Sequence, residues 1–120
     1  MTARARRVLI ADDDPVMTRA CVRLLRPHLQ VLVAHSLADA LRIIAAEKTL
    51  DAVWSDRHLP EANRGVSVLR AAAERHPSAL LLLVTADPGR RGLETLPPGV
   101  HVFDKSDAAE AVALMVQTLS

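Results

Sequence analysis

The stretch RVLIADDDPVM, residues 7–17, joins an apolar run to three consecutive aspartates, Asp12, Asp13 and Asp14. The run is continuously apolar after its first residue, as expected of a strand in a parallel sheet with both faces covered. Asp14 and Pro15 then have residue types preferred at the N-cap and the first position of a helix. Adjacent like charges repel one another, so the aspartates need a structural or chemical reason to stand together.

The rest of the chain alternates short apolar runs with amphipathic stretches, which predicts βαβ units and a parallel α/β sheet. Between the last two strands, residues 86–99 carry glycine and proline at both ends. Residues 90–96 are therefore expected to form at most one or two turns, so that the fourth helix is short or weak. Strands are expected over 7–11, 30–34, 51–55, 79–85 and 100–104, and helices over 15–25, after Ser36, over 66–76 and over 107–119.

Two of these helices begin with a capping-box pattern. Ser36 is followed three residues later by Asp39, and Asp107 by Glu110. In this pattern the first side chain accepts a hydrogen bond from the backbone of the residue three places on. Both pairs are predicted to start a helix.

Composition limits the class of protein. The chain has 120 residues, which fits a single domain over 1–120, and 50% of them are hydrophobic, which excludes disorder. A net charge of +1 gives no reason to expect nucleic-acid binding. No apolar run is long enough for a membrane span or a signal peptide. Cys21 is the single cysteine, so no internal disulfide can form, and we expect a cytoplasmic location.

Polar residues follow or end several of the predicted strands. In an open parallel sheet, ligands bind outside the carboxyl ends of the strands. Clustered carboxylates suit Mg²⁺, while a hydroxyl and an ammonium group suit the oxygens of a phosphoryl group in transfer. One carboxylate can then be the nucleophile. Each residue alone is explained as well by a helix cap, a turn, a strand position or a solvated charge, but the whole set at one edge indicates phosphoryl transfer: Asp12, Asp13, Asp56, Thr85 and Lys105.

From Val8 onward the chain resembles a response-regulator receiver domain of two-component signalling, of the chemotaxis-receiver type. The resemblance implies a flavodoxin-like (βα)5 fold, a doubly wound parallel sheet with strand order 2-1-3-4-5. It is carried by the acidic pair Asp12 and Asp13, by Asp56 within VWSDRHLPEANRG, by Thr85 with the small Ala86 after it, and by Lys105 within VFDKS.

The resemblance also implies a metal site. Mg²⁺, or Mn²⁺ in its place, would be bound directly by Asp13 and largely through water by Asp12. Asp56 and the backbone carbonyl of His58 would complete the protein ligands.

The same resemblance implies a function. Asp56 would accept a phosphoryl group from a histidine kinase or a histidine phosphotransfer protein. Lys105 would neutralise the phosphoryl charge, and Thr85 would hydrogen-bond the group and shift when it arrives. Such a domain is not an enzyme with a separate substrate, although it catalyses its own phosphorylation and dephosphorylation. Its output would pass to a downstream partner, to an effector domain outside this chain, or through a phosphorylation-dependent dimer.

Four features depart from the family pattern, the short fourth helix among them. Gly65 stands one place late, so the loop after the acceptor is one residue longer. Ser106 follows Lys105 where the family has a cis-forming proline, and a trans bond is expected here because cis non-proline bonds are costly. Val102 occupies the position of the switch aromatic, and Phe103, one place on, should point to the opposite face of the sheet.

Three further positions are predicted to tune the lifetime of the phosphorylated state. His58 and Asp87 stand two residues after Asp56 and Thr85, where family residues affect the access of water to the acyl phosphate. Ala86 is the small neighbour of the hydroxyl. An ordinary solvated-loop role for His58 and Asp87 is equally open from sequence.

Two other functions compete with this one. A small haloacid-dehalogenase-type phosphohydrolase would use Asp12 of an Asp12-x-Asp14 pair as nucleophile, with Thr85 and Lys105. That hypothesis leaves Asp56 without a role and lacks both a late acidic pair and a cap domain. A degenerate receiver would bind a partner without being phosphorylated; the intact set of site residues argues against it, and the missing proline and switch aromatic argue for it.

Overall fold

The computed structural model describes residues 5–87 and 89–120; residues 1–4 and 88, at the basic N-terminus and within 86–99, lie outside the described part. The strands are β1 (Arg7–Ala11), β2 (Gln30–Ala34), β3 (Ala52–Asp56), β4 (Leu80–Thr85) and β5 (His101–Asp104). The helices are α1 (Pro15–Leu25), α2 (Leu37–Ala46), α3 (Arg64–Arg75) and α4 (Ala108–Leu119), with a 3₁₀ turn at Lys105–Asp107.

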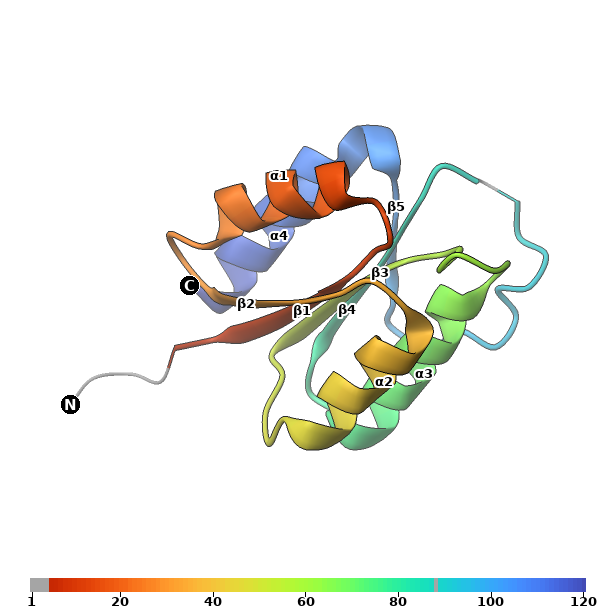
Figure 1. The fold of residues 1–120 in the computed structure, drawn as a ribbon, viewed down its shortest axis with the longest axis horizontal. Coiled ribbons are helices and arrows are strands. Elements are labelled where there is room, and N and C mark those ends of the chain that lie inside the picture. The colour runs from red at the N-terminus through yellow and green to blue at the C-terminus, as the bar shows by residue number, and fades with distance from the viewer. Residues whose placement is uncertain (1–4, 88) are drawn as a thin grey trace.

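The five strands form one parallel sheet in the order β2-β1-β3-β4-β5. Helices α1 and α4 lie on one face of the sheet, and α2 and α3 on the other (Figure 1). The predicted doubly wound fold and strand order are therefore confirmed. Because all strands are parallel, β1, β3 and β4 end at the same edge, and the polar residues that close them meet there.

The core consists of two mainly aliphatic layers, one on each face of the sheet. The layer under α2 and α3 includes Leu9, Val53 and Leu83, and the layer under α1 and α4 includes Ile10, Trp54 and Leu82. All six side chains are fully buried, in the alternation that adjacent strand positions require. Cys21 is buried in the layer under α1 and α4. No helix in the described ranges is long and apolar enough to span a membrane.

Helix starts agree with the sequence in two places and differ in a third. Asp14 caps α1, accepting hydrogen bonds from the N–H groups of Val16 and Met17, and Ser36 caps α2. The capping box expected at Asp107 is wrong, since its side chain makes no cap bond. The 3₁₀ turn begins earlier, and Asp104 caps it by accepting a hydrogen bond from the N–H of Ser106 at 2.9 Å.

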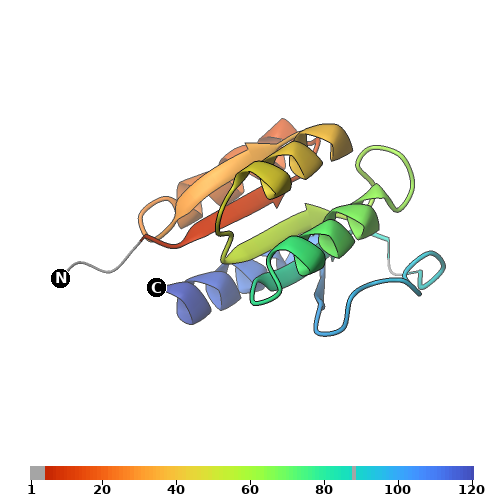
Figure 2. The ribbon, with the colours of Figure 1, turned by 90° about the horizontal axis from the view of Figure 1, so that it is seen from below.

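The connection between β4 and β5 forms no helix within the residues described. It makes two successive turns, in which Leu93 N–H donates to Arg90 O and Leu96 N–H to Leu93 O, each at 3.1 Å. Leu93 and Leu96 pack against the core layer under α2 and α3, so the connection supplies a little of the apolar cover that a helix would give. Figure 2 shows this connection as an uncoiled loop. The prediction that this helix is short or weak is confirmed: in the described residues, no helix forms between β4 and β5.

The region around β5 follows the expected alternation. Phe103 packs into the core layer under α1 and α4, whereas Val102 faces the other way and is 53% exposed. Every peptide bond in the described ranges is trans, including the one that joins Lys105 to Ser106. The aromatic ring therefore does not occupy the face on which Val102 lies.

Candidate functional site

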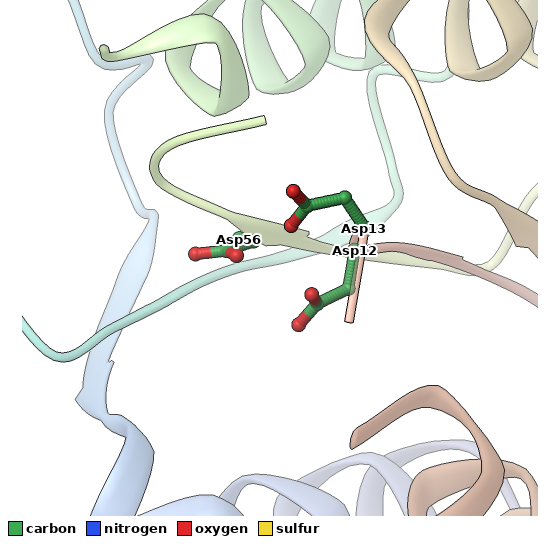
Figure 3. A group of neighbouring side chains, drawn as sticks. All are labelled: Asp12, Asp13 and Asp56. Atoms are coloured by element: carbon green, nitrogen blue, oxygen red, sulfur yellow. The ribbon is translucent and has the colours of Figure 1, made fainter. Parts of the chain in front are cut away.

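Three carboxylates meet at the carboxyl edge of the sheet. Asp12 and Asp13 follow β1, and Asp56 is the last residue of β3. The strand was expected to end at residue 55, so it is one residue longer at this end than predicted. One carboxylate oxygen from each residue lies within 4.8 Å of the others. Figure 3 shows the three side chains around a shared space. The sequence prediction that these residues come together is confirmed.

Asp12 is the buried member of this group. Its side chain has no exposed surface, and Oδ1 accepts a hydrogen bond from the N–H of Asp14 at 2.8 Å. Oδ2 is buried and has no hydrogen-bond partner in the part of the chain described. Burial raises the pKa of Asp12 from 3.8 to about 6, and the nearby charge of Asp56 adds to the effect. A buried, unpartnered carboxylate oxygen beside two other carboxylates suits a divalent cation, which binds oxygen ligands.

The raised pKa of Asp12 predicts how stability depends on pH without a divalent cation. The folded state binds this proton more tightly than the unfolded state, so the contribution of Asp12 to stability is present below pH 3.8 and is lost as the pH rises through about 6. We expect Asp12→Asn to be more stable than the wild type above that pH, by on the order of 2 kcal/mol, and to lose this advantage in acid. Urea unfolding of both proteins with a chelator, across this pH range, measures the difference. A constant difference would contradict the assignment.

Lys105 contacts the Asp56 carboxylate. Its Nζ donates a hydrogen bond to Asp56 Oδ2 at 3.2 Å, and the Asp56 side chain is 8% exposed. Partial burial acts to lower the pKa of Lys105, but the charges of Asp12 and Asp56 outweigh it and raise the pKa above its usual value. Lys105 is therefore a fixed positive charge beside the carboxylate, where it can balance added negative charge.

Gly65 brings the start of α3 against the backbone of Asp56. A Cβ at this position would lie 1.8 Å from the backbone oxygen of Asp56. The N–H of Gly65 donates to Arg57 O at 2.8 Å, so the loop closes directly onto the strand end. Two residues before Gly65, Asn63 adopts a left-handed conformation with φ of 61°.

Gly65→Ala is expected to destabilise the fold by roughly 1–3 kcal/mol, as overpacking typically does, because strand and helix must separate. The change should also weaken divalent-cation binding, since Asp56 moves with its own backbone. Ser67→Ala, at an exposed position of the same helix, is the matched control. Urea unfolding and calorimetric titration with Mg²⁺ measure the two effects. Equal stability of the two variants would contradict the close approach.

Thr85 is buried at the end of β4, and its hydroxyl is occupied by its own chain. Oγ1 accepts a hydrogen bond from the N–H of Asp87 at 2.9 Å and donates a long one to the Asp87 carbonyl at 3.4 Å. The hydroxyl is thus bonded to the β4–β5 connection rather than to Asp56. Ala86 next to it is exposed. The predicted movement of Thr85 toward a phosphoryl group stays a prediction.

The two proposed tuning residues touch each other. His58 Nδ1 accepts a hydrogen bond from the N–H of Asn63 at 3.0 Å, so the ring proton lies on Nε2, which donates to Asp87 Oδ2 at 3.1 Å. Hydrogen bonds from the N–H of Gly89 and from His58 lower the pKa of Asp87 below its ordinary value. This hydrogen bond joins the β3–α3 loop to the β4–β5 connection.

Arg57 is a site residue that sequence reasoning missed. Its side chain is 3% exposed and lies 3.7 Å from Asp87 Oδ2. The available signal was indirect: a connection without a helix leaves backbone carbonyls that need donors, and an arginine stands at the adjacent strand end. Its contacts are described below.

Comparison with known proteins agrees with this fold. A protein-family model described as "response regulator receiver domain" matches residues 8–97. No curated protein matches the chain.

Several solved structures are similar. A response regulator protein from Burkholderia pseudomallei, whose structure contains a phosphorylated aspartic acid, a calcium ion and citrate, has 25% identity over 94% of this chain and 67% of its own, with a TM-score of 0.79. The receiver domain of an HD domain-containing protein from Pseudomonas fluorescens Pf-5 has 24% identity over 99% and 90%, with a TM-score of 0.82. A receiver domain protein from Methanospirillum hungatei JF-1 has 19% identity over 97% of both chains, with a TM-score of 0.76.

The fold and the acidic edge define a flavodoxin-like signalling domain with a candidate divalent-cation site. The chain belongs to the response regulator receiver domain family. The phosphohydrolase alternative is therefore wrong. Its second aspartate, Asp14, is also taken up by capping α1, with its Oδ1 2.9 Å from the N–H of Val16.

Proposed function

We propose that this domain accepts a phosphoryl group on Asp56 and that the modification changes how the domain contacts its output. The observation that carries the proposal is the position of the Asp56 carboxylate between the Lys105 ammonium, at 3.2 Å, and the acidic pair that follows β1. A carboxylate held between a fixed cation and a candidate metal site is arranged for nucleophilic attack on phosphorus. The phosphorylated aspartic acid in the Burkholderia relative supports the same chemistry.

The proposed transfer starts from phosphohistidine on a histidine kinase or a phosphotransfer protein. An oxygen of Asp56 forms a bond to phosphorus, the bond between phosphorus and the imidazole nitrogen breaks, and the imidazole keeps the electron pair and takes up a proton. Lys105 can move from Asp56 to an oxygen of the phosphoryl group and balance its charge. Thr85 can release its bond to the β4–β5 connection and donate its hydroxyl proton to another oxygen. Positioning and charge account for most of the catalysis in such transfers.

Mg²⁺ is the proposed cation, with Mn²⁺ as a substitute. Asp12, Asp13 and Asp56 supply the carboxylate oxygens, and the backbone carbonyl of His58 is the fourth expected ligand. When bound, the ion offsets the negative charge that develops on the phosphoryl oxygens. The calcium ion in the Burkholderia structure supports a divalent cation in this family.

Removing the cation is expected to abolish phosphorylation. Incubation with acetyl phosphate and Mg²⁺ should add one phosphoryl group, seen as a single mass increment in the intact protein, and excess chelator should prevent it. Mg²⁺ alone should raise the melting temperature, because it binds the folded acidic pair. A degenerate receiver would show no mass increment under either condition. Equal labelling with and without chelator would contradict the proposed role of the ion.

Phosphorylation is proposed to act by changing a contact surface of this domain. A downstream partner, a phosphorylation-dependent dimer, or an effector domain beyond this chain would each use the surface that changes on phosphorylation. The Pseudomonas relative, a receiver domain of an HD domain-containing protein, supports the third arrangement. We place the domain in the cytoplasm, in agreement with its single buried cysteine and with the proposed histidine-kinase partner. A net charge of +1 gives no basis for direct nucleic-acid binding.

A further inference from the structure

Arg57 carries a buried charge, and its N–H groups therefore need hydrogen-bond acceptors within the protein. Only 2% of the residue is exposed, and a buried guanidinium is costly unless its N–H groups are hydrogen-bonded. The acceptors are the side chain of Asn63 and three backbone carbonyls of the β4–β5 connection. Nε donates to Asn63 Oδ1 at 2.8 Å, Nη1 to Asp87 O at 3.0 Å and to Gly89 O, and Nη2 to Arg91 O at 2.5 Å.

These carbonyls lie in the connection that forms no helix. Inside a helix each carbonyl accepts a hydrogen bond from an N–H four residues later. Without a helix, carbonyl groups turned toward the protein need other donors. The planar guanidinium offers several donors at fixed angles, so a single side chain from the end of β3 replaces hydrogen bonds that a helix would make.

A second contact holds the same connection in place. Gly92 has φ of +89°, and a Cβ there would lie 2.1 Å from Asn63 Nδ2. The backbone of the connection therefore rests against the same Asn63 amide that accepts from Arg57. Arg57, Asn63 and Gly92 together join the β3–α3 loop to the β4–β5 connection.

This junction determines where Asp87 lies. Arg57 binds the Asp87 carbonyl and lies 3.7 Å from its carboxylate, and His58 donates to the same carboxylate oxygen. The N–H of Asp87 in turn donates to the Thr85 hydroxyl. Within the described part of the chain, the Arg57 side chain makes no hydrogen bond or ion pair with Asp56, so any effect on Asp56 passes through Asp87 and Thr85.

We propose that Arg57 is a positioning residue that takes the place of the absent helix. It holds Asp87 and Thr85 beside the acceptor and thereby lengthens the lifetime of phosphorylated Asp56. The inference rests on the proposed function of Asp56. In hydrolysis, a water oxygen bonds to phosphorus, the bond from phosphorus to the Asp56 oxygen breaks, and both water protons leave with phosphate as H₂PO₄⁻. While the connection is held, the His58–Asp87 pair covers the approach of that water.

The test compares decay of the phosphorylated wild type with that of Arg57→Met, which keeps the apolar stem and removes every donor. Both are labelled with acetyl phosphate and Mg²⁺, freed of donor, and followed by intact mass. We expect Arg57→Met to lose phosphate roughly two- to tenfold faster, a range typical of coupled neighbours in one hydrogen-bond network. Arg57→Lys, which has one donor centre instead of three, should fall between them. Arg70→Met, at an exposed position of α3, should decay like the wild type.

A double-mutant cycle separates positioning from simple loss of stability. If Arg57 acts mainly through the Asp87 carboxylate, adding Arg57→Met to Asp87→Ala should change the decay rate little further; any remaining change measures the part that passes through the Asp87 backbone to Thr85. An unchanged or longer lifetime in Arg57→Met would overturn the inference, even if its melting temperature falls. If Arg57→Met does not fold, Gly92→Ala, which displaces Asn63, must show the faster decay, and an unchanged lifetime there overturns the inference. Absence of labelling in the wild type would instead refute the proposed function of Asp56.

Discussion

Replacing Asp56 with asparagine is expected to abolish phosphate incorporation completely. Asparagine has nearly the same shape, so the contact of Gly65 with the backbone of residue 56 should survive and the protein should fold. An amide is too poor a nucleophile to form an acyl phosphate, so the asparagine cannot take the place of the carboxylate. Intact mass after incubation with acetyl phosphate and Mg²⁺ measures the loss.

Asp107→Asn is a matched control for this change. Asp107 is exposed and makes no cap bond, so its substitution should leave labelling at the wild-type level. Labelling that persists in Asp56→Asn and disappears in Asp12→Asn would move the nucleophile to the end of β1, as the phosphohydrolase hypothesis required. That pattern would contradict the account of the site.

Lys105→Met is expected to slow phosphorylation by roughly 100-fold, the effect of removing one group that stabilises the charge of a transition state. The ammonium is the one cation that the structure places within hydrogen-bonding distance of Asp56, at 3.2 Å, among the described residues. Methionine keeps the length and apolar stem of the side chain while removing the charge. The rate constant with acetyl phosphate at saturating Mg²⁺ is the measurement.

The chain offers a close control, because Lys48 and Lys105 are its two lysines. Lys48 is exposed near the end of α2, so Lys48→Met should phosphorylate at the wild-type rate. If Lys105→Met also kept that rate, the contact with Asp56 would be a surface ion pair with little energetic effect, and the lysine would have no part in transfer.

Most of the fold follows from local sequence signals. Short apolar runs mark the five strands, and Asp14 and Ser36 mark helix starts that the structure retains. The Asp107 prediction failed because capping depends on where the preceding turn begins. That turn is set by Asp104, whose bond to Ser106 starts a 3₁₀ turn that the sequence pattern does not reveal.

The candidate site was predictable because topology does most of the positioning. Once β1, β3 and β4 are parallel neighbours, their final residues must share an edge, so Asp12, Asp56 and Thr85 come together whatever the loops do. How deeply the site residues are buried could not be predicted from the sequence. The contact of Gly65 with Asp56 depends on how closely α3 approaches β3, and the unpartnered oxygen of Asp12 depends on how the chain packs around the end of β1.

The β4–β5 connection shows what sequence reasoning could not supply. Glycine and proline correctly predict that a helix is weak there, but they do not say what replaces it. The replacement comes from Arg57, about 30 residues earlier, through contacts whose sequence separation is 30 to 34. Local patterns carry no information on such a long-range interaction, because an isolated arginine after a strand usually lies in solvent.

Chemical location of the phosphoryl group tests the central claim most directly. Wild-type protein labelled with acetyl phosphate and Mg²⁺ can be treated with borohydride, which reduces an acyl phosphate to an alcohol and so converts phosphoaspartate to homoserine. Peptide mass spectrometry then locates the converted residue. The account predicts homoserine at position 56 and at no other aspartate. Homoserine at Asp12 or Asp13, or phosphate incorporation without any conversion, would contradict it.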